Sequence, residues 1–135
     1  MTGTGRDTET VVLDTNALMM PVEFDVRVFD ELERLTGRSP AALDLLVPRA
    51  VVAELDRLAE GSDAAARAAR AGRDLVDRCR VVETEEAYAD DAVLALAREY
   101  EALVVTNDKP LRDRLLDAGV RAACARGGDT LAEVS

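Results

Sequence analysis

Short apolar runs alternate along this chain with longer segments of helical periodicity. The runs are rich in Val and Leu and stop at turn-forming residues, which indicates buried strands, whereas apolar residues recurring every three to four positions indicate amphipathic helices. We predict strands at 10–13, 45–47, 81–82, 103–106 and 120–125, and helices at 24–35, 50–59, 63–78, 90–100 and 109–118. Strands that alternate with helices are joined by right-handed crossovers, so the pattern predicts one doubly wound α/β domain with a parallel sheet.

Polar segments flank this predicted domain. Residues 1–9 indicate a flexible N-terminal tail and residues 127–135 a short C-terminal tail, which leaves 10–126 as a single domain of a 135-residue chain. No apolar run approaches the roughly 18 residues of a membrane helix. Because the N-terminus also lacks the apolar stretch of a signal peptide, we expect a cytoplasmic protein that does not contact membranes.

Two of the predicted strands lead into a carboxylate. Strand 10–13 runs directly into Asp14, and strand 103–106 is followed by Asn107 and Asp108. An open α/β sheet keeps its ligand crevice beyond the carboxyl ends of its strands, so the two aspartates share one crevice if these strands are neighbours. The alternative is that each aspartate only caps the helix that follows it.

Glu54 is a third candidate, on the predicted helix 50–59. It lies at the edge of the apolar stripe of that helix, about 40° around from Leu58, and therefore faces partly inward. A glutamate in that position needs a partner. That partner is either the carboxylate crevice, through a shared ion, or an arginine such as Arg57 or Arg70.

The fourth candidate is one of two adjacent aspartates at the start of the predicted helix 90–100. Asp90 lies about 60° from the buried direction of that helix and Asp91 about 160° from it. We therefore favour Asp90 as the inward acid. Asp91 is kept as the second choice, because helix ends placed from sequence shift by about two residues. The alternative reading of Asp90 is an acid that stabilises the helix N-terminus.

Several carboxylates that converge in one crevice repel each other, and a divalent cation removes that conflict. The chain has no His, and its two cysteines, Cys79 and Cys124, are isolated, so the usual zinc ligand sets are excluded. Oxygen ligands alone favour Mg²⁺ or Mn²⁺, and such a site suits phosphodiester hydrolysis by a metal-activated water. Lys109, the only lysine, stands beside Asp108, where it either contacts a phosphate or is a solvated side chain.

The charge balance limits the kind of nucleic-acid binding that this chain can support. It carries 17 basic and 27 acidic residues, for a net charge of −10. A broad electrostatic grip on nucleic acid needs cationic side chains that neutralise phosphates. Any nucleic-acid chemistry here must therefore depend on metal ions and a local cluster of arginines.

Four segments together carry a resemblance to a known family. They are LDTNAL at 13–18, VVAEL at 51–55, YADDAVLALA at 88–97 and VVTNDKPLRDRL at 104–115. With these motifs the chain resembles PIN-domain nucleases from residue 11 to about residue 126. It is more similar to the rRNA-processing PIN nucleases and their archaeal relatives than to the VapC-type toxins.

This resemblance implies an α/β/α sandwich with a parallel five-stranded sheet in the order 3-2-1-4-5. It also implies Mg²⁺- or Mn²⁺-dependent cleavage of single-stranded RNA, in rRNA maturation or RNA turnover, by a homodimer. The family's metal-holding acids correspond to Asp14, Glu54, Asp90 and Asp108 in this chain. The family's positions that orient these acids correspond to Asn16 and Thr106.

Two other functions fit the same resemblance. The chain could be the toxin of a VapBC-type toxin–antitoxin pair, with the same chemistry and an antitoxin in its groove. It could also be a non-catalytic PIN scaffold for protein partners such as a ribosome-assembly factor, although four intact acids argue against that. A haloacid dehalogenase-type phosphatase is disfavoured, because its D-x-D motif needs an aspartate where Asn16 stands.

Overall fold

The computed structural model describes residues 8–134, so most of the predicted N-terminal tail lies outside the described residues. Within that range the first strand begins one residue earlier than predicted, at Glu9. The elements, in chain order, are β1 (Glu9–Leu13), α1 (Thr15–Glu23), α2 (Val28–Thr36), the 3-10 turn η2 (Pro40–Ala42), β2 (Leu43–Pro48), α3 (Arg49–Leu58), α4 (Ala64–Leu75), the 3-10 turn η3 (Val76–Arg78), β3 (Arg80–Val82), α5 (Ala89–Tyr100), β4 (Leu103–Val105), α6 (Lys109–Asp117), β5 (Ala122–Arg126) and β6 (Thr130–Val134).

The sheet has the strand order β3-β2-β1-β4-β5-β6, and its first five strands in that order are parallel. The predicted order 3-2-1-4-5 is thereby confirmed, with a sixth, antiparallel strand added at the β5 edge. At the centre of the sheet Leu13 pairs with Val105, so β1 and β4 end side by side. Asp14 and Thr106, the next residue of each strand, are therefore neighbours at the carboxyl edge of the sheet.

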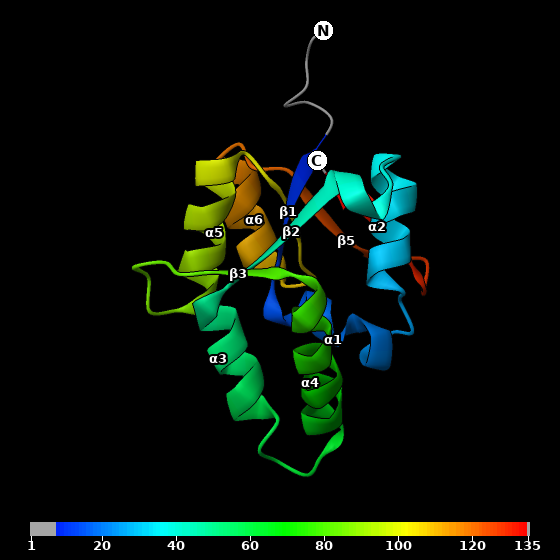
Figure 1. Cartoon of the computed structure of the whole chain (residues 1–135), viewed down its shortest axis with the longest axis vertical. Coiled ribbons are helices and arrows are strands. Elements are labelled where there is room, and N and C mark those ends of the chain that lie inside the picture. The colour runs from blue at the N-terminus through cyan, green and yellow to red at the C-terminus, as the bar shows by residue number, and fades with distance from the viewer. Residues whose placement is uncertain (1–7, 135) are drawn as a thin grey trace, which may run out of the picture.

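Helices cover both faces of this sheet (Figure 1). On one side α5 packs against β1 and β2, and α6 packs against β5, whereas α2 lies on the other side against β6. Helices α3 and α4 pack together and extend beyond the edge where the parallel strands end. The central strands are buried on both faces, since all three residues of β4 and residues 11–13 of β1 have no exposed surface.

The predicted helix 24–35 is wrong at its beginning. The helix α1 ends at Glu23, Phe24 is its C-cap residue, and α2 begins only at Val28. Asp25 adopts a φ of 56° between the two helices, a left-handed conformation that no helix contains. Phe24 lies four residues before Val28, a helical spacing that led to the prediction of one continuous helix. Its side chain, however, is 50% exposed.

The predicted C-terminal tail is also wrong, because residues Thr130–Val134 form β6. Gly127 and Gly128 both have positive φ, 65° and 97°, and allow the tight turn that brings β6 antiparallel to β5. Helix α2 holds the new strand, since Glu31 accepts a hydrogen bond from the backbone N–H of Leu131 and Arg34 donates one to its carbonyl oxygen.

Close contact between α1 and α4 fixes the helix that begins at the carboxyl edge of β1. A side chain at Gly72 of α4 would place its Cβ 2.8 Å from the backbone oxygen of Leu18 in α1, so only glycine permits this approach. Asp63 caps α4 and accepts a hydrogen bond from the N–H of Ala66. No helix in residues 8–134 is both long and apolar enough to cross a membrane.

Candidate active site

Asp14 is buried at the end of β1, with 3% of its surface exposed. Although it is the N-cap residue of α1, its side chain makes no capping hydrogen bond. Its Oδ2 instead accepts hydrogen bonds from the Thr106 hydroxyl at 2.8 Å and from the Asn16 side-chain amide at 3.0 Å. The capping alternative is therefore excluded for Asp14, whose carboxylate is held by two polar side chains.

The partners of Asp14 are themselves held in place by backbone groups. The Thr106 hydroxyl, which is fully buried, accepts a hydrogen bond from the N–H of Asp108, so its proton is directed to Asp14. The Asn16 carbonyl oxygen accepts a hydrogen bond from the N–H of Asn107 at 2.7 Å, which turns the amide nitrogen toward Asp14. The carboxylate is thus fixed in one orientation by residues from β1, α1 and the loop after β4.

Asp108 lies in that loop and is the N-cap residue of α6. Its Oδ1 accepts a hydrogen bond from the N–H of Leu111 at 3.1 Å, so the capping interpretation is correct for one of its oxygens. Its Oδ2 takes part in none of the hydrogen bonds found within residues 8–134. One oxygen of Asp108 thus stabilises the helix, and the other is available to a ligand.

Asp90 and Asp91, in the first turn of α5, have different surroundings. Asp91 pairs with Arg114 of α6 at 3.0 Å, and its side chain is half-exposed. Asp90 is partly buried and makes no ion pair in the described part of the chain. Burial raises the pKa of Asp90, and the negative charges of Asp108 and Glu54 raise it further. Of the two aspartates, Asp90 is therefore the one that interacts electrostatically with the other site acids.

Glu54 is positioned on α3, at the same edge of the sheet. Its Oε1 accepts a short hydrogen bond from the buried Thr15 hydroxyl, and its Oε2 lies 3.8 Å from Arg57. Arg70, the other predicted partner, instead donates to the backbone oxygens of Ala59 and Gly61. The sequence did not identify Thr15, because a threonine after an aspartate is an ordinary turn residue and the contact joins positions 39 apart.

The electrostatics of these acids differ from those of ordinary surface carboxylates. Burial raises the pKa of Asp14 from 3.8 to about 6; the hydrogen bond from Thr106 opposes the rise, and the charges of Asp90 and Glu54 add to it. None of the ion pairs within residues 8–134 includes Asp14, Asp90 or Asp108. The four predicted acids therefore meet at one edge of the sheet and repel one another, and one weak contact with Arg57 is their only direct ion pair in this range.

The geometry and the donor chemistry of the site restrict the kind of metal ion it fits. As the side chains stand, no three Asp, Glu, His or Cys residues within 8–134 lie close enough together to hold one ion directly. The thiols are not ligands at this edge: Cys124 is buried in β5, and burial raises the pKa of Cys79 to about 12. Mg²⁺ usually binds through one or two carboxylates and keeps several waters. The site fits a hard divalent ion bound in that way, and it does not fit a closed cage of protein ligands.

Four basic side chains near the site, Lys109, Arg49, Arg57 and Arg114, pair with acids. Lys109 pairs with Asp113 one turn further along α6 at 3.0 Å, and its side chain is 71% exposed, as expected of a solvated lysine. Arg49, at the start of α3, pairs with Glu83 at 3.0 Å. Together with Arg57 and Arg114, these residues are the local basic groups that a bound phosphate would meet.

The fold is that of a known class of α/β proteins. Residues 11–128 match the family model described as PIN like domain, and the chain therefore belongs to that family. PIN domains are generally nucleases, so membership supports a nuclease role. No curated protein matches the chain in sequence.

Solved structures show the same fold at low sequence identity. The PIN domain endonuclease Utp24 is 23% identical, with a TM-score of 0.71 over 89% of this chain and 87% of that one. VapBC2 from Rickettsia felis, solved with a DNA fragment from its promoter, is 14% identical, with a TM-score of 0.63 over 87% and 99% of the two chains. A domain of a functionally unknown protein from Methanocaldococcus jannaschii is 18% identical, with a TM-score of 0.65 over 95% and 99%.

Proposed function

We propose that this protein is a divalent-metal-dependent endoribonuclease that cleaves single-stranded RNA. The observation that carries the proposal is the state of Asp14. This carboxylate is buried, fixed by Thr106 and Asn16, lacks a cationic partner in the described residues, and lies within reach of the charges of two further acids. A chain that buries such a group without a counter-charge leaves room for one from outside, and family membership favours a metal ion.

Asp14, Asp90, Asp108 and Glu54 would hold the ion, one or two of them directly and the others through its bound waters. Their oxygen ligands favour Mg²⁺ or Mn²⁺. When bound, such an ion activates a water and stabilises charge on the leaving oxygen. The chain contributes the positions of its acids: Thr106 and Asn16 both bind Oδ2 of Asp14, and Leu111 binds Oδ1 of Asp108. The other oxygen of each aspartate lies outside these hydrogen bonds.

The arginines at the rim give the site a way to accept phosphates despite the acidic chain. Arg57 lies 3.8 Å from Glu54, and Arg114 lies 3.0 Å from Asp91. Both guanidinium groups are about half-exposed or more. An ion that neutralises Glu54 weakens the hold on Arg57 and frees it for a phosphate. Binding of RNA is thus coupled to binding of the metal.

The proposal is tested with end-labelled single-stranded RNA, single-stranded DNA and duplex RNA, incubated with Mn²⁺, Mg²⁺ or EDTA at low and high salt. We expect the wild type to cleave single-stranded RNA only with the metals, and Asp14→Asn and Asp108→Asn to lose that cleavage. Asp113→Asn is the matched control, because this acid lies on α6 but pairs only with Lys109. Equal cleavage by the wild type and both site variants contradicts the catalytic proposal.

The biological role follows one of two lines. A role in rRNA maturation or RNA turnover in the cytoplasm, as a homodimer or with a ribosome-assembly factor, accords with the resemblance of the sequence motifs to the rRNA-processing PIN nucleases. A toxin role accords with the likeness to VapBC2 and requires an antitoxin. Induced expression distinguishes them: a toxin arrests growth unless Asp14 is replaced, and co-expression of a protein encoded beside it restores growth. Sedimentation of the purified protein tests the dimer.

A further inference from the structure

Tyr88 occupies a position that neither helix capping nor core packing explains. It is the N-cap residue of α5, where Ser, Thr, Asp or Asn usually accepts a hydrogen bond from the first turn. The Tyr88 side chain makes no such bond, and it is 75% exposed. The ring thus contributes little to the stability of the folded chain.

The other aromatic side chains have clear structural surroundings or lie elsewhere. Phe29 is 8% exposed and lies beneath the guanidinium of Arg78, 4.1 Å from the ring centre. Tyr100 is partly buried and faces Arg80. Phe24 is half-exposed but lies at the C-terminal end of α1, about 13 Å along that helix from the site. Tyr88 is the exposed aromatic that lies beside a site acid.

Tyr88 precedes Asp90 by two residues, a span of at most about 7 Å of chain. The loop that leads to it is acidic, with Glu83, Glu85 and Glu86 before the tyrosine. Glu83 pairs with Arg49, but Glu85 and Glu86 make no ion pair within residues 8–134, so their charges disfavour a phosphate contact in this loop. An uncharged ring can still hold a nucleotide through its base, because every base has a π-face that stacks on aromatic side chains.

Resting on the proposed function, we propose that Tyr88 stacks on one base of single-stranded RNA, beside the phosphate that the proposed metal site binds. Base faces are accessible only where RNA is unpaired, so this contact selects single strands over duplexes with little preference for sequence. A protein-binding role would instead place the ring in an apolar patch. Its neighbours along the chain are the exposed Ala87, the partly buried Ala89 and the glutamates of the loop.

The test measures RNA binding in the Asp14→Asn background, so that the RNA stays intact. Fluorescence anisotropy compares the parent with Tyr88→Ala, Tyr88→Phe and, as matched control, Phe24→Ala. We expect Tyr88→Ala to bind single-stranded RNA about tenfold more weakly, the order of one lost base-stacking contact, and the other two to bind like the parent. Equal binding by Tyr88→Ala and the parent overturns the proposal.

An abasic scan locates the contact independently. A single abasic position in the RNA should weaken binding to the parent and leave binding to Tyr88→Ala unchanged, because the base and the ring form one interaction. Equal losses in both proteins at every position overturn stacking. Stacking is also overturned if Tyr88→Ala keeps the RNA affinity of the parent but no longer binds a protein that the parent binds. That result would assign the ring to a protein interface.

Catalysis by otherwise wild-type protein separates this proposal from the nuclease proposal. Tyr88→Ala should raise KM about tenfold with little change in kcat, since stacking binds substrate and transition state alike. RNA binding with the expected abasic pattern but no metal-dependent cleavage leaves stacking in place and removes the nuclease. Metal-dependent cleavage by Tyr88→Ala with an unchanged KM supports the nuclease proposal and overturns stacking. Failure of every variant to bind RNA overturns both proposals.

Discussion

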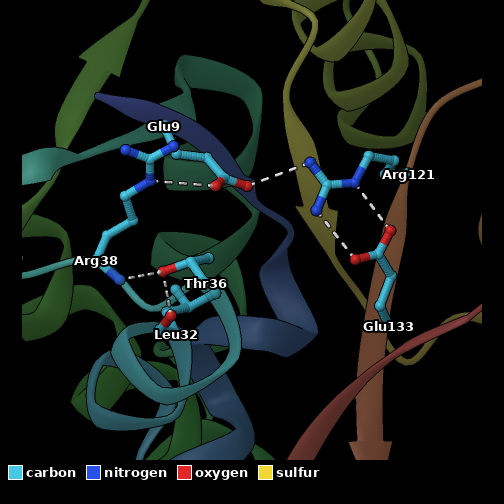
Figure 2. A network of polar contacts seen from close by, with 6 residues as sticks. All are labelled: Glu9, Leu32, Thr36, Arg38, Arg121 and Glu133. Atoms are coloured by element: carbon cyan, nitrogen blue, oxygen red, sulfur yellow. Dashed lines mark hydrogen bonds and ion pairs between the residues drawn. The ribbon is translucent and has the colours of Figure 1, made fainter. Parts of the chain in front are cut away.

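The two edges of the sheet treat acidic side chains in opposite ways. Where the parallel strands begin, the Glu9 carboxylate lies between Arg38 at 3.8 Å and Arg121 at 3.3 Å, and Arg121 also pairs with Glu133 at 2.8 Å (Figure 2). The hydrogen bonds from Arg121 hold the pKa of Glu133 below its ordinary value. Where the strands end, Asp14 is more deeply buried and has no such partner among residues 8–134, and its pKa rises to about 6.

The difference shows that the missing counter-charge is a local property of the site. All but one of the 17 basic residues are arginines, and eight of these arginines form ion pairs within residues 8–134. At the carboxyl edge, Arg114 pairs with Asp91, while the neighbouring Asp90 makes no ion pair in the described residues. The folded chain thus tolerates repulsion among these acids, which is the arrangement expected of a site that receives a cation.

The largest expected effect separates the two edges by activity. Asp14→Asn should lower metal-dependent cleavage of single-stranded RNA by more than about 100-fold, because even residues that only orient metal ligands are worth 10- to 100-fold. Glu133→Gln, an acid-to-amide change at the opposite edge, should leave the rate within about twofold of wild type. Initial rates at saturating Mn²⁺ check both. A similar loss in both variants would mean that the rate follows overall stability rather than the site.

The second prediction concerns pH. The pKa of Asp14 is about 6 in the folded chain against 3.8 ordinarily, so the folded state keeps a proton that the unfolded state has lost. Stability therefore falls as pH rises between these values. Without divalent ions, the wild type should lose up to about 3 kcal/mol relative to Asp14→Asn between pH 4 and 7, at about 1.4 kcal/mol per pH unit.

Urea unfolding in EDTA across this pH range measures that difference, and acids that are not coupled to Asp14 cancel from it because both proteins contain them. Mn²⁺ should reduce the slope for the wild type only, since an ion that binds ionised Asp14 opposes its protonation. Parallel stability curves for the two proteins would show that Asp14 ionises at its ordinary pH.

The third prediction compares two threonine hydroxyls. Thr106→Val removes the donor to buried Asp14 and the acceptor for the N–H of Asp108, and should cost about 1–3 kcal/mol at pH 7.5. Thr36→Val, which loses hydrogen bonds to Leu32 and Arg38 near the opposite edge, should cost about 0.5 kcal/mol or less because water can replace them. The Thr106 cost should shrink at pH 4.5, where Asp14 is protonated. Equal costs at both pH values would contradict the role of Thr106 in holding the charged form.

The sequence predicted the centre of this molecule better than its margins. The strands β1 and β4 are buried on both faces, so their apolar runs are continuous and end clearly at polar residues. That ending predicted Asp14 and Asp108 at one edge of the sheet, where the structure places them. The sequence did not reveal the break at Asp25, because Phe24 continued the helical spacing of apolar residues. It did not reveal β6 because only one residue of that strand, Leu131, is buried, so the strand has no apolar run.

The contacts within the site were less predictable than its residues. The bond from Thr15 to Glu54 and the pairing of Asp91 with Arg114 join different elements, and their geometry depends on tertiary packing and rotamers. No local pattern encodes them. Asp108 shows a further limit: capping and site placement are compatible, since one carboxylate has two oxygens.

The smallest expected effect tests the paired edge itself. Arg121→Met keeps the aliphatic stem but removes the guanidinium that holds Glu9 and Glu133 together. These groups are partly exposed, so the loss should be about 1 kcal/mol or less at low salt, and it should diminish at 1 M salt as screening weakens the wild-type pairs. Urea unfolding at both salt concentrations measures it, with Arg67→Met, an exposed arginine of α4 outside the ion pairs of the described residues, as control.

Cleavage by Arg121→Met should match the wild type, because the neutralised edge supplies stability and no ligand. A larger loss in Arg121→Met that salt does not reduce would show that packing of the arginine, rather than its charge, stabilises this edge, and the electrostatic contrast between the two edges would then fail.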